Sequence, residues 1–117
     1  MKISKAEAFH KSKHSIELWD YATNNPDFGF VYVEVSKGHF QEFYDKESTF
    51  MYFIIEGQGT FYLNDEAISV ESGDFLRIPP LTRIYYMGSM KMTLITSPSW
   101  KAENEVEVRR IDPEVGA

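Results

Sequence analysis

The sequence predicts an all-β domain, because short runs of β-branched and aromatic residues alternate with turn residues along most of the chain. Hydrophobic residues make up 43% of the 117 residues, and aromatic residues alone make up 15%. A chain of this length can close one hydrophobic core without disulfides or metals. We therefore expect a single domain over residues 1–117, built as a sandwich or barrel of short strands.

The first segment, residues 1–21, carries two different signals. Ser4 followed by Glu7 has the spacing of a capping box, which allows a short N-terminal helix. Residues 15–21 read better as a strand, with Ile16 and Leu18 on one face. Residues 22–29 are dense in turn formers, and they predict a loop.

From there the pattern is almost entirely that of strands separated by turns. The predicted strands are 30–35, 40–44, 49–56, 60–64, 67–70, 74–79, 83–88, 91–97 and 105–111. The turn signals between them are Gly38, Gly57, Gly59, Asn64–Asp65, Ser72–Gly73, Pro79–Pro80 and Gly88. Residues 112–117 are expected to form a terminal tail.

One predicted strand is apolar on both of its faces, over Phe50 to Ile55. Since strand side chains alternate, one set faces the interior and the other needs a cover of its own. The N-terminal strand, the chain termini or a second subunit could supply that cover. We predict a homodimer, with coverage by the chain itself as the alternative.

Composition narrows the classes of partner. Cysteine is absent, which excludes disulfides, thiolate zinc sites and thiol nucleophiles. The net charge of -6 argues against a nucleic-acid partner, which needs a basic surface. No signal-peptide pattern and no apolar run long enough to span a bilayer is visible, so we expect a cytoplasmic protein without a membrane partner.

Two spacing patterns lie in the middle of the chain. The first places Gly38, Tyr44, Lys46, Phe50 and Gly57 at the intervals of a motif that reads glycine, histidine, histidine, glutamate, glycine. The second places Gly73, Pro79, Leu81, Ile84 and Gly88 at the intervals of a motif that reads glycine, proline, glycine, histidine, asparagine.

These two motifs resemble those of the cupin superfamily, in particular its small single-domain members. The resemblance covers about residues 31–107, and it implies a jelly-roll barrel, also called a double-stranded β-helix. Both frames are matched without a gap, although several of the motif residues themselves are replaced.

The replaced residues bear on metal binding. In metal-bearing cupins, the two histidines and the glutamate of the first motif and the histidine of the second bind one divalent metal. Those positions hold Tyr44, Lys46, Phe50 and Ile84 here. Phenylalanine and isoleucine have no donor atom, so we predict no metal and no other cofactor, and no metal-dependent activity is carried over.

The same frame does not favour a displaced metal site. His39 has the opposite strand parity to Tyr44, so it is expected to point away from the interior. A site made of His39, Glu42 and Glu47 would need a backbone rearrangement for which the sequence gives no reason.

The replaced positions predict an apolar, aromatic chamber with a few polar groups. Tyr44 and Lys46 are the acid–base candidates, because burial lowers the pKa of an amine and a phenol can donate a proton. The predicted ligand-binding residues are Glu42, Phe50, Tyr52, Ile54, Arg77, Ile84 and Tyr86. Trp100 is expected to plug one end of the barrel or to pack on a partner, with a ligand-stacking lid as the alternative.

Three functions stay open on these grounds. The first is a metal-free cupin that binds a small organic molecule in its barrel. The second is a metal-independent isomerase, epimerase or lyase that uses Tyr44 and Lys46. The third is a structural or dimerising module whose barrel is filled by its own side chains.

Overall fold

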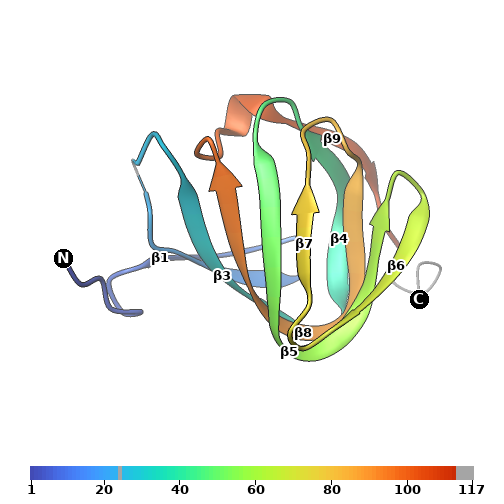
Figure 1. Ribbon diagram of the computed structural model, residues 1–117, viewed down its shortest axis with the longest axis horizontal. Coiled ribbons are helices and arrows are strands. Elements are labelled where there is room, and N and C mark those ends of the chain that lie inside the picture. The colour runs from blue at the N-terminus through green and yellow to red at the C-terminus, as the bar shows by residue number, and fades with distance from the viewer. Residues whose placement is uncertain (24, 113–117) are drawn as a thin grey trace.

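The computed structural model describes residues 1–23 and 25–112, and it confirms the predicted all-β class. Within these residues, antiparallel strands curl into a barrel, with one short 3-10 helix beside its rim (Figure 1). The strands are β1 Phe9–Lys13, β2 Ile16–Asp20, β3 Gly29–Val35, β4 Gly38–Asp45, β5 Thr49–Leu63, β6 Glu66–Glu71, β7 Phe75–Ile78, β8 Ile84–Ser97 and β9 Glu105–Arg110. The 3-10 helix η1 covers Ala102–Asn104.

All the strands belong to one sheet. Its order is β1-β2-β3-β8-β4-β9, and β5 pairs with β8, β6 and β7. The two long strands β5 and β8 run antiparallel from the pair Thr49 and Ser97 to the pair Leu63 and Ile84. This curled antiparallel sheet agrees with the jelly-roll barrel that the motif spacing implied.

Two glycines allow β5 and β8 to bend together. The sequence predicted separate strands on either side of Gly57–Gly59 and of Gly88, but the structure continues through both. Gly59 and Gly88 face each other across the ladder, and a Cβ on Gly88 would lie 2.5 Å from the Cα of Gly59. The glycines that were predicted to end strands instead bend them, which closes the barrel.

The tightest hairpins are two-residue turns. Asn64 and Asp65 have φ of 50° and 71° and join β5 to β6, as their sequence predicted. His14 and Ser15 have φ of 51° and 72° and join β1 to β2. This second turn was not predicted.

The possible N-terminal helix is reduced to one turn. Ser4 and Glu7 do make the predicted contact, with the Ser4 hydroxyl donating to the Glu7 carboxylate at 2.8 Å. From Phe9 onward the chain pairs with β2 as strand β1 instead of continuing as a helix. Pairing with a neighbouring strand satisfies the backbone of these residues, and the local helix signal is overridden.

The barrel core is aromatic, as predicted. Its buried residues include Phe50, Tyr52, Phe61 and Tyr86. The ring centroids of Phe61 and Tyr86 are 4.7 Å apart, and those of Tyr52 and Tyr86 are 5.9 Å apart.

The outer face of β5 is left open by the chain's own strands. Phe53 and Ile55 are 43% and 45% exposed, and Phe75 beside Phe53 is 59% exposed. The N-terminal hairpin extends the sheet from β3 and does not cover this face. A second subunit on these residues stays a prediction.

Two smaller points complete the fold. No helix within the described residues has the length and apolar character to cross a membrane. Of the tail predicted for residues 112–117, only Asp112 lies within the described residues.

The glycine pair gives a prediction for stability. Gly88 has φ +132°, and its added Cβ would meet Gln58 and Gly59 backbone atoms at 2.5 Å. Gly73 has φ +94° with nothing within 4 Å of its added Cβ. Gly73→Ala should therefore cost only backbone strain, about 1–2 kcal/mol, whereas Gly88→Ala should cost about 2–5 kcal/mol. Urea unfolding of both variants measures the two losses of stability. Equal losses would show that the close approach of β5 and β8 adds no cost to a side chain at Gly88.

Candidate active site

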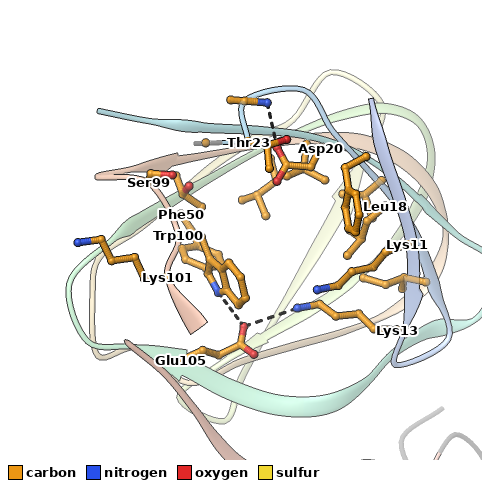
Figure 2. A pocket seen from close by; sticks show the side chains of 18 of the residues that line it. Lys11, Lys13, Leu18, Asp20, Thr23, Phe50, Ser99, Trp100, Lys101 and Glu105 are labelled. Carbon is orange, nitrogen blue, oxygen red and sulfur yellow. Dashed lines mark hydrogen bonds and ion pairs between the residues drawn. The ribbon is translucent and has the colours of Figure 1, made fainter. Parts of the chain in front are cut away.

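A cavity of about 510 Å³ lies inside the barrel and opens between the N-terminal hairpin and the segment after β8. Its deep wall comes from β4, β5 and β8, and its mouth comes from β1, β2 and residues 99–105. Figure 2 shows Lys11 and Lys13 on one side of the mouth, with Trp100 and Glu105 facing them. The barrel is therefore not filled by its own side chains.

His39 is the buried titratable group on the deep wall. It is the second residue of β4, is 3% exposed, and pairs across the ladder with Tyr86 of β8. Its Nδ1 lies 2.7 Å from the carbonyl oxygen of Gln41. A carbonyl can only accept, so in the neutral ring Nδ1 carries the proton and Nε2 keeps its lone pair.

Burial controls the charge of this imidazole. Desolvation lowers the pKa of His39 to about 3, while the Gln41 hydrogen bond opposes the shift and His14 and Lys13 add to it. Near neutral pH the ring is therefore uncharged, with a free nitrogen available as a base.

Tyr86 stands beside this histidine, and Tyr52 packs against Tyr86 with ring centroids 5.9 Å apart. The rings of His39 and Tyr86 are 5.3 Å apart, and both tyrosines line the cavity. Burial raises the pKa of Tyr52 and of Tyr86 above the ordinary value, with Tyr86 adding to the effect on Tyr52. Both phenols therefore stay protonated and can donate.

The mouth of the cavity carries a small charged cluster. Glu105 accepts a hydrogen bond from the Trp100 indole at 3.2 Å, and it lies 4.0 Å from the ammonium of Lys13 (Figure 2). The Lys13 ammonium is also 4.9 Å from the centroid of the Trp100 ring. Burial lowers the pKa of Lys13, the Glu105 charge opposes that shift, and Lys11 adds to it.

The structure brings together some of the predicted ligand-binding residues. Phe50, Tyr52 and Tyr86 line the cavity. Ile54 and Ile84 are buried in the same core but do not line the cavity. Trp100 lies at the mouth, where it forms part of the cavity wall.

Tyr44 and Lys46 are not brought to this cavity. Tyr44 is half-buried and pairs with Val106 of β9, while Lys46 is exposed just after β4. The residues of β4 that line the cavity are His39 and Phe43. The motif spacing had placed Tyr44 on the inward face, so that assignment is wrong by one residue. The expectation that His39 points away from the interior is wrong for the same reason.

Glu42 and Arg77 also lie elsewhere. Glu42 is fully buried, and its carboxylate accepts from Arg109 at 2.9 Å and from Arg83 at 3.4 Å. This pairing gives it a structural role in linking β4 to β9 and to the residue that precedes β8. Arg77 is exposed on β7, paired with Met51 on the outer side of β5.

Among the polar residues that line the cavity, sequence reasoning missed Lys13, His39 and Glu105. The one available signal is the strand parity that His39 shares with Phe43, whereas the motif spacing places Tyr44 inward. Lys13 could not be found, because the strand that carries it was not predicted.

The residues at the four cupin metal positions do not fit a divalent metal. Phe50 and Ile84 have no donor atom, and Tyr44 and Lys46 do not line the cavity. Within residues 1–23 and 25–112, no three His, Cys, Asp or Glu side chains come together as a metal site.

Solved structures of one protein resemble the whole chain. Pac13, described as a unique nucleoside dehydratase, is 39% identical, with a TM-score of 0.94 over 97% of this chain and 95% of its own. A Streptomyces PAC13 structure with uridine and a histidine-to-glutamine substitution is 38% identical over the same shares, also with a TM-score of 0.94. Two further PAC13 structures with uridine each carry a tyrosine-to-phenylalanine substitution.

More distant matches show the fold alone. KdgF from Halomonas sp. is 17% identical, with a TM-score of 0.70 over 86% of this chain and 94% of its own. No curated protein gives a significant match. The model of the EutQ-like cupin domain matches residues 26–107. The chain therefore belongs to the cupin superfamily, as a protein with a EutQ-like cupin domain.

Proposed function

We propose that this protein is a metal-independent nucleoside dehydratase, which removes water from the sugar of a nucleoside bound in its barrel. The observation that carries the proposal is the buried, neutral His39, whose Nε2 has no hydrogen-bond partner within the described residues, set beside Tyr86 in a cavity that Tyr52 also lines. A cavity of about 510 Å³ is also of the size that holds small organic ligands.

The similar proteins support the same reaction class. Pac13 is described as a nucleoside dehydratase, and PAC13 was solved with uridine after substitution of one histidine or of either of two tyrosines. The present cavity contains one histidine and two tyrosines on its walls, namely His39, Tyr52 and Tyr86. These are the same residue types.

Removal of water needs a base and an acid, and the cavity supplies both. Nε2 of His39 takes a proton from a sugar carbon, and the electron pair of that C–H bond becomes a C=C bond. The C–O bond on the neighbouring carbon breaks, and the departing hydroxide takes a proton from the Tyr86 phenol. Return of the imidazolium proton to the phenolate restores both groups, so the reaction needs no co-reactant.

Lys13 has an electrostatic role in this proposal. Negative charge develops on the substrate while its C–H bond is breaking. The partly buried ammonium, held near Glu105, is placed at the mouth to stabilise that charge more strongly than water would.

Substitution of the base tests the proposal. His39→Gln should lower kcat for dehydration about 10²- to 10⁴-fold, because general-base catalysis contributes that much, and should change uridine affinity far less. Tyr86→Phe should lower kcat in the same direction. Product formation by chromatography and uridine binding by calorimetry measure the two effects.

Tyr44→Phe and Lys46→Ala serve as matched controls, because both residues lie outside the cavity. Each should keep kcat within about threefold of the wild type, since neither can reach the reacting atoms. Loss of turnover in these two variants together with full activity in His39→Gln would refute the proposed site.

The shifted histidine pKa predicts how stability depends on pH. The unfolded chain binds a proton on His39 below about pH 6.5, whereas the folded protein holds this pKa at about 3. The contribution of the neutral ring to the free energy of unfolding is therefore complete above about pH 6.5 and is lost as the pH falls toward 3. In that window the loss is about 1 kcal/mol per pH unit.

Urea unfolding at pH 7, 5.5 and 4 measures this dependence. The wild type should lose stability on acidification more steeply than His39→Gln, while His10→Gln, at an exposed site, should follow the wild type. Parallel curves for the wild type and His39→Gln would contradict the assignment of a buried neutral imidazole.

A further inference from the structure

A second histidine packs against the ring of His39. His14 forms the turn between β1 and β2, and its ring centroid lies 5.1 Å from that of His39, with the two planes tilted by 58°. His14 is half-buried, and it is not among the residues that line the cavity, whereas His39 and Tyr86 line it. His14 therefore contacts the proposed base without facing the ligand.

The backbone holds His14 firmly in this place. Its carbonyl oxygen accepts a hydrogen bond from the backbone N–H of Phe40 at 3.0 Å. Because Phe40 follows His39 in β4, this bond fastens the hairpin turn to the strand that carries the base. His14 has φ of 51°, and turns of this kind favour Asn-Gly, so the turn itself does not call for a histidine.

The contact between the two rings does not pass a proton. Nδ1 of His39 donates to the carbonyl oxygen of Gln41, and Nε2 is the atom that the proposed mechanism assigns to the substrate. Neither nitrogen of His39 is left for a hydrogen bond to His14. His14 can therefore act on His39 through its charge and its packing, but not as a proton relay.

Charged groups from two strands act on His14. Lys11 and Lys13 come from β1, and Glu105 and Glu107 come from β9. Burial lowers the pKa of His14 below its ordinary value of 6.5; Lys13 and Lys11 add to this shift, and the two glutamates oppose it. The ring is therefore uncharged near neutral pH, and it gains a proton only as the pH falls below 6.5.

The two histidines take up protons in a fixed order on acidification. Burial acts more strongly on His39, which is 3% exposed and has a pKa of about 3, than on the half-buried His14. His14 thus becomes charged while His39 is still neutral. Since like charges repel, a positive His14 with its ring 5.1 Å away makes an imidazolium on His39 less favourable, and His39 becomes a weaker base.

We propose that His14 is a positioning residue for the base: its neutral ring supports His39, and a proton on His14 slows proton abstraction by His39. The inference rests on the proposed function, because it assumes that His39 takes a proton from the nucleoside. His14 thus makes turnover depend on pH, while nucleoside binding stays constant because His14 is not part of the cavity wall.

A series of charges at position 14 tests this role. His14→Phe keeps a ring that is never charged, and His14→Lys places a positive charge there at every pH used. Between pH 7.5 and 5, kcat for dehydration should fall about 3- to 30-fold in the wild type and change less than about twofold in His14→Phe. His14→Lys should already be slower by about the same 3- to 30-fold at pH 7.5. Uridine affinity, measured by calorimetry at both pH values, should stay within about threefold in all three proteins.

His10→Phe is the matched control, because His10 lies in the same hairpin but stacks on Trp19 and does not line the cavity. Its kcat should show the same dependence on pH as the wild type. NMR titration of the wild-type imidazoles adds a test that needs neither turnover nor a variant. His14 should become protonated below pH 6.5 while His39 keeps its neutral form with the proton on Nδ1.

Three outcomes would overturn the role of His14 and leave the reaction class intact. The first is an equal fall of kcat on acidification in the wild type and His14→Phe. The second is a loss of uridine affinity in His14→Phe as large as its loss of kcat, because His14 would then serve the hairpin. The third is protonation of His39 before His14. Absence of dehydration by the wild type at every pH would instead overturn the proposed function, and this inference with it.

Discussion

The close approach of β5 and β8 at Gly59 and Gly88 is the constraint on which the rest of the structure depends. Without a Cβ at either position, the two backbones come close enough to bend together while their ladder continues. Because of the bend, β5 pairs with β8 from Thr49 to Leu63 on one side and with β6 and β7 on the other. The side chains of Tyr52, Phe61 and Tyr86 are thereby directed into one interior.

That interior determines the chemistry, because burial acts in opposite directions on bases and on phenols. Desolvation lowers the pKa of His39 and raises those of Tyr52 and Tyr86, so all three groups are neutral over the same range of pH. A neutral imidazole can accept a proton and a neutral phenol can give one. The same apolar wall thus holds the imidazole and the phenols in the neutral forms that a base and an acid require, while the charges of Lys13 and Glu105 add smaller effects.

The fold was predictable from the sequence to a greater extent than the site. Turn residues and strand periodicity depend on local chemistry, and the turn at Asn64–Asp65 formed where it was expected. The face of β4 depends on its register against β8 and β9, both of which are distant in the sequence. Both ladders are irregular between His39 and Phe43, and this local change left no mark in the sequence. As a result Tyr44 was assigned the inward position that Phe43 takes.

The buried polar groups of the described residues differ in how completely they are paired. Glu42 is fully buried, and two arginines compensate its charge, so its pairing is complete within the chain. Three other buried oxygens, Gln41 Oε1, Asp45 Oδ2 and Thr96 Oγ1, have no partner within the described residues. Of these residues only Thr96 belongs to the cavity wall, and its hydroxyl oxygen is itself inaccessible. An unpaired buried oxygen therefore does not by itself mark a ligand site in this fold.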